Sequence, residues 1–230
     1  MAQIDKNTVK ADNQLGNRSY ITFENENNNG IRVLFVGNSI TRHSPKEDIG
    51  WFNDWGMAAS SKENDYVHVV KAKVLKTNPD ASFCICQAAK WESNYINGET
   101  QLEDFGIARD FDADIIIIRL IENCPHKNFE PEIFETQYKK FVSYFNKSGK
   151  ASTIVTTGFW KHPGDSIIIK AAKDMDIPCI NLGELGEQSD MRADGLFEHS
   201  GVAAHPSDKG MAAIADLIYT EAEKILIAKK

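Results

Sequence analysis

Five short runs of apolar, mostly β-branched residues recur along the chain, and the segments between them carry helical periodicity. The runs span residues 31–36, 81–86, 114–120, 152–157 and 177–182. They are nearly continuous instead of alternating, as is typical of strands whose two faces are both covered. Alternation of such strands with helices predicts a parallel sheet between two helical layers. We therefore expect an α/β fold, a three-layer α/β/α sandwich with a five-stranded parallel sheet.

The intervening helices are predicted from apolar spacing and from residues that begin or end helices. Ser60 and Glu63 fit a capping box ahead of one apolar stripe, and Pro131 stands at the start of another. The expected helices cover residues 61–77, 100–109, 131–147, 165–175 and 207 to the end of the chain.

The length of 230 residues is enough for one sizeable core. Residues 1–30 are polar and rich in asparagine, so we expect an N-terminal arm or edge extension there, either disordered or pairing at the edge of the sheet. A single domain is expected over residues 31–230.

Composition disfavours several classes of partner. The chain carries 26 Lys and Arg against 33 Asp and Glu, a net charge of −7, which argues against nucleic acid. No apolar run approaches the roughly 20 residues of a membrane helix, so no membrane partner is expected. The N-terminus has no apolar segment like that of a signal peptide, which favours a cytoplasmic protein; a removed signal peptide would make it secreted.

Cofactors and metals are not expected. The four cysteines lack the spacing of a zinc site, and we interpret them as free thiols. The histidines show no short ligand spacing, and the glycine-rich loops of nucleotide-binding proteins are absent.

Three polar fragments follow or flank strands, where ligands bind in such sheets. Ser39 comes directly after the first run, as a nucleophile or as part of a capped turn. Asn123 follows the third run, as an oxyanion donor or as a partner of loop carbonyls. His205 precedes Pro206 and the last helix, as a general base or as an ordinary polar contact.

In order and placement the fragments resemble the SGNH (GDSL) hydrolase family. That family has Gly-Asp-Ser or Gly-Asn-Ser after its first strand, Gly-x-Asn-Asp after a middle strand and Asp-x-x-His-Pro before its last helix. Here the segments read Gly37-Asn38-Ser39, Glu122-Asn123-Cys124 and Val202-Ala203-Ala204-His205-Pro206. The resemblance spans residues 31 to about 225. It implies a flavodoxin-like sandwich, with Ser39 as the nucleophile, His205 as the base, and Asn123 and the Ser39 N–H as oxyanion donors.

The chain departs from the family pattern at four places. Val202 stands where the family has its acid, so Glu198, Asp194 or a backbone carbonyl are the alternatives for orienting the imidazole. The middle motif keeps only its Asn. No glycine follows the second run, which leaves the backbone N–H of Ala89 or Glu92 as a further oxyanion donor. Asn38 replaces the commoner Asp, which we interpret as a mild change.

Tryptophans near these motifs suggest a saccharide substrate, because aromatic faces suit the apolar faces of sugars; core packing is an equal alternative for each. The expected substrate-binding residues are Asn38, Trp51, Trp55, Ala89, Trp91 and Glu92. The sequence thus predicts a serine esterase that removes small acyl groups, acetyl foremost, from a carbohydrate. The alternatives are a non-catalytic carbohydrate-binding protein, a thioesterase or lysophospholipase, and a sugar O-acyltransferase. The oligomeric state is left open.

Overall fold

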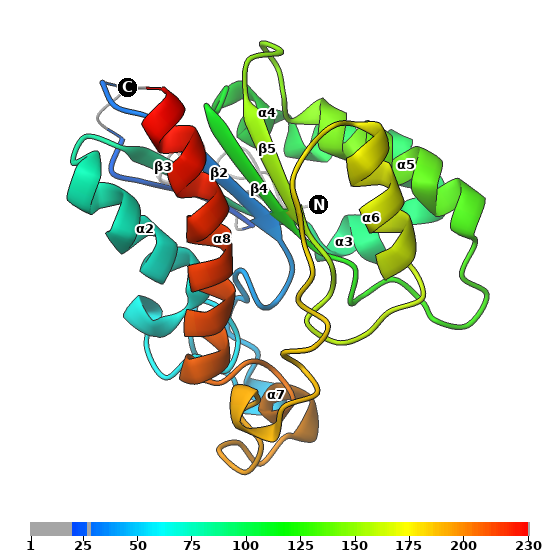
Figure 1. Cartoon of the computed structure of the whole chain (residues 1–230). Helices are drawn as coiled ribbons and strands as arrows, with labels where there is room; N and C mark the ends of the chain where they lie inside the picture. Colours follow the sequence, from blue (N-terminus) through cyan, green and yellow to red (C-terminus); the bar gives the residue numbers. More distant parts are fainter. Residues whose placement is uncertain (1–19, 27–28, 230) are drawn as a thin grey trace, which may run out of the picture.

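Six strands form one sheet in the computed structural model, which describes residues 20–26 and 29–229 (Figure 1). Their order is β1-β3-β2-β4-β5-β6, and every pair is parallel except β1 with β3. The strands are β1 (Ile21–Glu24), β2 (Arg32–Gly37), β3 (Ser82–Gln87), β4 (Ile115–Arg119), β5 (Ser152–Thr156) and β6 (Cys179–Ile180). The five expected strands are confirmed, but the strand count of five is wrong.

The additional strand is β1, which lies inside the N-terminal segment whose structure the sequence left open. It pairs antiparallel with β3, Ile21 opposite Cys86. Glu24 at its end accepts hydrogen bonds from Lys62 and from Lys71. This strand therefore docks both to the sheet edge and to a neighbouring helix; residues 1–19 lie outside the described part of the chain.

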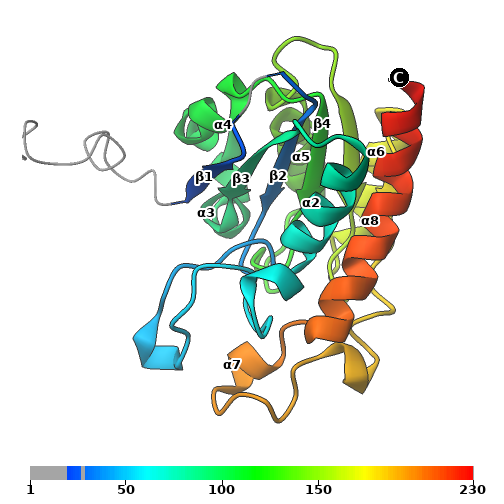
Figure 2. The same cartoon turned by 90° about the vertical axis from the view of Figure 1, so that its left-hand side faces the viewer.

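Helices cover both faces of the sheet (Figures 1 and 2). The longer helices are α2 (Tyr66–Thr77), α5 (Pro131–Tyr144), α6 (Asp165–Asp174) and α8 (Asp208–Ala228). The short ones are α3 (Ala89–Ser93), α4 (Gly106–Asp110) and α7 (Ser200–Ala203), with 3₁₀ helices η1 (Glu47–Ile49), η2 (Lys62–Asn64), η3 (Tyr95–Phe105) and η4 (Ser189–Met191).

Two helices differ from the prediction: one begins at a different residue, and the other is divided into two helices. The capping box at Ser60 is wrong: α2 is capped by Asp65, whose side chain accepts from the His68 N–H at 2.8 Å. Ser60 instead donates from its N–H and its hydroxyl to Asp208 at the start of α8. The segment 100–109 is shared between η3 and α4.

Alternate residues of each strand face opposite layers, which explains the unbroken apolar runs. In β4, Ile115 and Ile117 pack toward α2 and α8, while Ile116 and Ile118 pack toward η3, α4, α5 and α6. Cys84 and Cys86 share one face, as their spacing predicts. The result is the expected three-layer sandwich.

A third, smaller apolar cluster lies outside the two layers. Its buried members are Trp51, Met57, Ala58, Ala193 and Val202. They come from the loop after β2 and from the segment that contains α7, which Figure 2 shows below the sheet. We call this group the loop cluster.

The strand order determines where a site can form. The five parallel strands run β3-β2-β4-β5-β6, the flavodoxin-like order. After β2 the chain forms β3 on one side of β2, and the next strand, β4, lies on its other side. β2 and β4 therefore flank a topological switch point. Ligands bind at such a point, beyond the carboxyl ends of the strands.

Candidate active site

Ser39 and His205 lie in hydrogen-bond contact across this switch point. The Ser39 Oγ is 2.8 Å from the His205 Nε2, although 166 residues separate them. Ser39 belongs to the turn after β2, where the N–H groups of Thr41 and Arg42 donate to the Asn38 carbonyl. His205 lies between α7 and α8. The two side chains that the sequence singles out are therefore together.

A backbone carbonyl orients the imidazole. The His205 Nδ1 is 2.7 Å from the Gly201 oxygen, and a carbonyl can only accept, so Nδ1 carries the proton. Nε2 is then free to accept from the Ser39 hydroxyl. Burial lowers the pKa of His205 to about 4, against the opposing effect of the Gly201 bond. The imidazole is neutral at pH 7, as a general base must be.

No carboxylate takes the place of the family's acid among the described residues. Val202 is buried in the loop cluster. Asp194 pairs with Arg192 at 2.6 Å, and Glu198 is exposed. Of the three alternatives left by the sequence, the structure has the backbone carbonyl. Trp160 adds a second restraint, with its ring centroid 5.2 Å from that of His205 in an edge-on arrangement.

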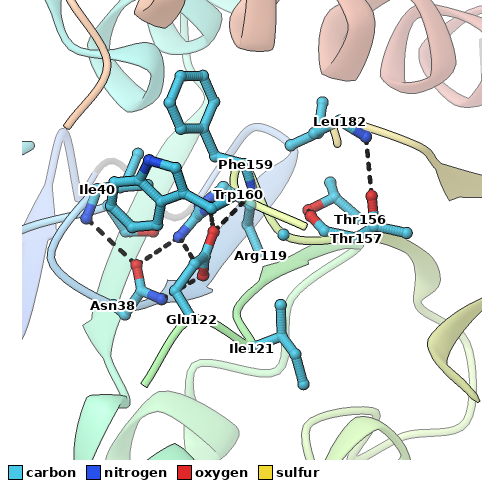
Figure 3. Close-up of polar contacts among 12 residues, drawn as sticks. Asn38, Ile40, Arg119, Ile121, Glu122, Thr156, Thr157, Phe159, Trp160 and Leu182 are labelled. Carbon is cyan, nitrogen blue, oxygen red and sulfur yellow. Dashed lines mark hydrogen bonds and ion pairs between the residues drawn. The ribbon is translucent and has the colours of Figure 1, made fainter. Parts of the chain in front are cut away.

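Asn38, beside Ser39, is the centre of a buried polar network (Figure 3). Its Nδ2 donates to the Glu92 Oε1 at 2.9 Å and to the Glu122 Oε2 at 2.6 Å. Its Oδ1 accepts from the Arg119 guanidinium and from the Ile40 N–H. The side chain is fully buried, and both of its amide hydrogens are used. Substrate contact by Asn38 is therefore excluded in this arrangement.

Arg119 and Glu122 form a buried ion pair at the end of β4. The guanidinium lies 2.5 Å from one Glu122 oxygen and 3.1 Å from the other. The Phe159 N–H, just beyond β5, donates to the same carboxylate at 2.8 Å. Burial tends to raise the pKa of Glu122, but the charge and hydrogen bonds of Arg119 outweigh it and lower that pKa. Glu122 is thus ionised beside the site.

Glu92 is the second buried carboxylate of the network. It accepts from the Ile121 N–H at 2.5 Å and from the Asn123 Nδ2 at 2.7 Å, besides Asn38. Burial, helped by the Glu122 charge, raises the pKa of Glu92 to about 7. Its side chain faces the network and does not line the surface.

Several N–H groups were expected to bind an oxyanion. The Asn123 Nδ2 uses one hydrogen on Glu92, which leaves its second hydrogen for a ligand. Within residues 20–26 and 29–229, the Ser39 N–H has no hydrogen-bond partner. The Ala89 N–H makes one long contact of 3.4 Å to the Gln87 side chain. The Glu92 N–H likewise makes one contact of 3.4 Å, to the carbonyl of Ala88 at the start of α3.

The three tryptophans expected at the substrate site differ in how deeply they are buried. Trp91 is fully buried and lies 4.2 Å from Phe141 between ring centroids, so it is a core residue. Trp51 is 1% exposed, and its indole N–H donates to the His43 carbonyl. For these two the substrate-binding interpretation is wrong, and the core alternative holds, because their faces are covered by protein. Trp55 is partly exposed.

Sequence reasoning missed the network as a unit. Arg119 follows four isoleucines at the end of a buried strand, which is the one signal that pointed to it. The Gly201 carbonyl left no signal, since any residue supplies a backbone oxygen.

No metal site is present in the described part of the chain, where no three His, Cys, Asp or Glu side chains gather. Among the described helices, none combines the length and hydropathy needed to cross a bilayer.

Comparison with known proteins gives a match in structure alone. No protein-family model and no curated protein matches the sequence. A solved G-D-S-L family protein from Desulfitobacterium hafniense aligns with a TM-score of 0.51 at 16% identity, over 82% of this chain and 98% of that one. The chain has the SGNH (GDSL) hydrolase fold.

Two further structures that align with the chain are a carbohydrate esterase and an esterase active on acetylated mannans. A family two carbohydrate esterase from Clostridium thermocellum, solved with cellohexaose, gives a TM-score of 0.57 at 15% identity, over 85% of this chain and 64% of that one. A two-domain esterase active on acetylated mannans, crystallised with mannopentaose, gives 0.56 at 17% identity over 85% of this chain. The alignment spans 50% of that esterase, so the chain corresponds to about half of its length.

Proposed function

We propose that this protein is a serine esterase that removes small acyl groups, acetyl foremost, from a carbohydrate. The observation that carries the proposal is the 2.8 Å contact between the Ser39 Oγ and the His205 Nε2, with Nδ1 held by the Gly201 carbonyl. A nucleophile, a neutral base and a group that orients the base are the elements of acyl transfer by serine.

The reaction follows from these positions. The Ser39 Oγ attacks the ester carbonyl carbon while its proton passes to the His205 Nε2. The Ser39 N–H and the Asn123 Nδ2 stabilise the oxyanion, and the resulting imidazolium keeps its Nδ1–H on the Gly201 carbonyl. When the tetrahedral intermediate collapses, the imidazolium protonates the leaving sugar alkoxide. Water then attacks the acyl-enzyme by the same route, with His205 again as base.

The substrate class is supported by the structural relatives and by a surface hollow on the loops that carry the site. The hollow, of about 640 Å³, lies between the loop after β2 and the segment before α7; Ser39 and His205 do not line it, and Ile49 and Leu196 are among the residues that do. Its lining combines Phe52 and Phe197 with the carboxylates of Glu47, Asp48 and Glu198. Aromatic rings among polar groups suit a sugar better than a long acyl chain. Two relatives of the same fold are esterases solved with oligosaccharides.

The test is hydrolysis of p-nitrophenyl acetate and release of acetate from acetylated mannan. We expect turnover by the wild type and a loss of at least about 10³-fold in kcat for Ser39→Ala, with an unchanged circular dichroism spectrum. An acetyl ester should be hydrolysed faster than the C8 ester, whereas a thioesterase or lysophospholipase would show the reverse. Equal traces of activity in wild type and Ser39→Ala, together with oligosaccharide binding, would instead identify a non-catalytic binding protein.

A further inference from the structure

A single buried carboxylate connects the nucleophile turn with the candidate oxyanion donor. Glu92, from α3, accepts from Asn38 next to Ser39 and from the side chain of Asn123 after β4. It also accepts from the backbone N–H of Ile121, and at 3.4 Å from that of Asn123. The turn after β2, helix α3 and the loop after β4 are far apart in the sequence, and they meet at the two carboxylate oxygens of Glu92.

An ionised carboxylate can only accept hydrogen bonds, so it determines which end of an amide faces it. The Asn123 side chain must present its NH₂ group to Glu92, 2.7 Å away, and its second hydrogen remains unused there. Asn123 is itself exposed, and nothing else that the structure describes fixes its side chain. The orientation of this amide thus depends on Glu92.

We infer that Glu92 is a positioning residue of the esterase site, whose ionised carboxylate fixes the Asn123 amide so that an N–H is available to the oxyanion. The inference rests on the proposed function and deepens it. Glu92 does not contact the reacting atoms; it acts through Asn123, and on its other side it accepts from Asn38.

The charge state of Glu92 follows from its neighbours. Arg119 and Glu122 face it from β4 and the loop after it, together with the Cys124 thiol, and Asn38 faces it from the turn after β2. Burial and the Glu122 charge raise the pKa of Glu92 to about 7. A protonated Glu92 can donate to the Asn123 Oδ1 and turn the amide around, which withdraws the oxyanion donor. Activity should therefore increase with pH through this value.

The experiment compares kcat and KM for p-nitrophenyl acetate at pH 8 in the wild type, Glu92→Gln, Asn123→Ala and the double variant. Glu99→Gln is the matched control, because Glu99 is an exposed glutamate whose one ion pair among the residues that the structure describes is with Lys140. A Gln at position 92 places a second NH₂ group against that of Asn123. We expect kcat to fall at least about tenfold in Glu92→Gln with KM within about twofold, and about 10²-fold in Asn123→Ala. Glu99→Gln should match the wild type.

Two results separate positioning from a merely structural role. In the Asn123→Ala background, Glu92→Gln should lower kcat by less than about threefold more, since its target is gone. The decrease in kcat between pH 8 and pH 6 should occur in the wild type and be absent from both single variants. Full multiplication of the two losses, or a wild-type kcat in Glu92→Gln, would overturn the inference while Ser39-dependent turnover remains.

If Glu92→Gln does not fold, the pH profiles of wild type and Asn123→Ala decide, and the same step near pH 7 in both overturns the inference. A wild type that hydrolyses the ester no faster than Ser39→Ala overturns the proposed function and this inference with it.

Discussion

The Nδ1 of His205 lies 2.7 Å from the carbonyl oxygen of Gly201, one residue before the buried Val202. The group that orients the imidazole is therefore a backbone carbonyl of α7, and no carboxylate within the described ranges accepts from the His205 Nδ1. A carbonyl fixes the tautomer as a carboxylate does, but it brings no net charge to stabilise the imidazolium.

The pH dependence should reflect the burial of His205. Its pKa is lowered to about 4, below the ordinary value of 6.5, and activity needs the neutral form. Activity is therefore present above the lowered pKa and lost as the pH falls through about 4. In Glu92→Gln, which lacks the Glu92 carboxylate, kcat/KM between pH 3.5 and 8 should show a single acidic limb near pH 4, from His205. A midpoint near 6.5 would contradict the burial of the imidazole.

Val202→Asp should not restore a triad. Val202 is fully buried in the loop cluster, so a carboxylate there would be desolvated without a partner. We expect a loss of about 3 kcal/mol or more in the free energy of unfolding and no gain in kcat, against about 2 kcal/mol for the control Val202→Ala. Urea unfolding and steady-state kinetics measure both. An increase in kcat with unchanged stability would show that position 202 can supply an acid.

Asn38→Asp should be strongly destabilising, although the two residues are similar in shape. The amide donates to Glu92 and to Glu122, so an Asp would place a third carboxylate against a single Arg119. Loss of two donors at a buried charged network costs about 3–5 kcal/mol. The exposed Asn97→Asp is the control, with an expected change within about 0.5 kcal/mol. Equal unfolding free energies for the two variants would mean that the network tolerates the charge.

Trp91→Ala should affect stability and not substrate binding. Its ring packs on Phe134, Tyr138 and Phe141, and removing a buried aromatic side chain costs about 3–5 kcal/mol. KM for an acetylated oligosaccharide should stay unchanged in the folded fraction. Trp55→Ala, at a partly exposed position, is the comparison variant. An increase in KM for Trp91→Ala without loss of stability would return Trp91 to the substrate site.

The five parallel strands could be predicted because each is a nearly continuous apolar run, which is typical of a strand covered by helices on both faces. β1 was not, because its sequence lies in a polar segment and its partners, Cys86 in β3 and Lys71 in α2, are distant along the chain. The start of α2 was predicted at the wrong residue, because Asp65 caps the helix and Ser60 does not. Ser60 binds Asp208 at the start of α8, which local sequence does not reveal.

At the site, the sequence predicted Ser39 and His205 because each follows a recognisable local pattern. It interpreted Asn38 as a mild replacement for Asp, which is wrong, because the amide hydrogens satisfy two glutamates that come from other segments. The burial of Glu92 could not be predicted either, since α3 brings it under loops contributed by β2 and β4. Such a role depends on the tertiary structure.

The loop cluster has a consequence for how the protein loses activity. It joins Trp51, which follows Ser39 by 12 residues, to Val202, three residues before His205, and it is a separate cluster that shares the partly exposed Trp55 with one of the two large cores. A small unit of this kind can open while the sheet remains folded. Mild urea should therefore abolish catalysis at concentrations where the far-ultraviolet spectrum is still native, so that inactivation and global denaturation become two separate transitions.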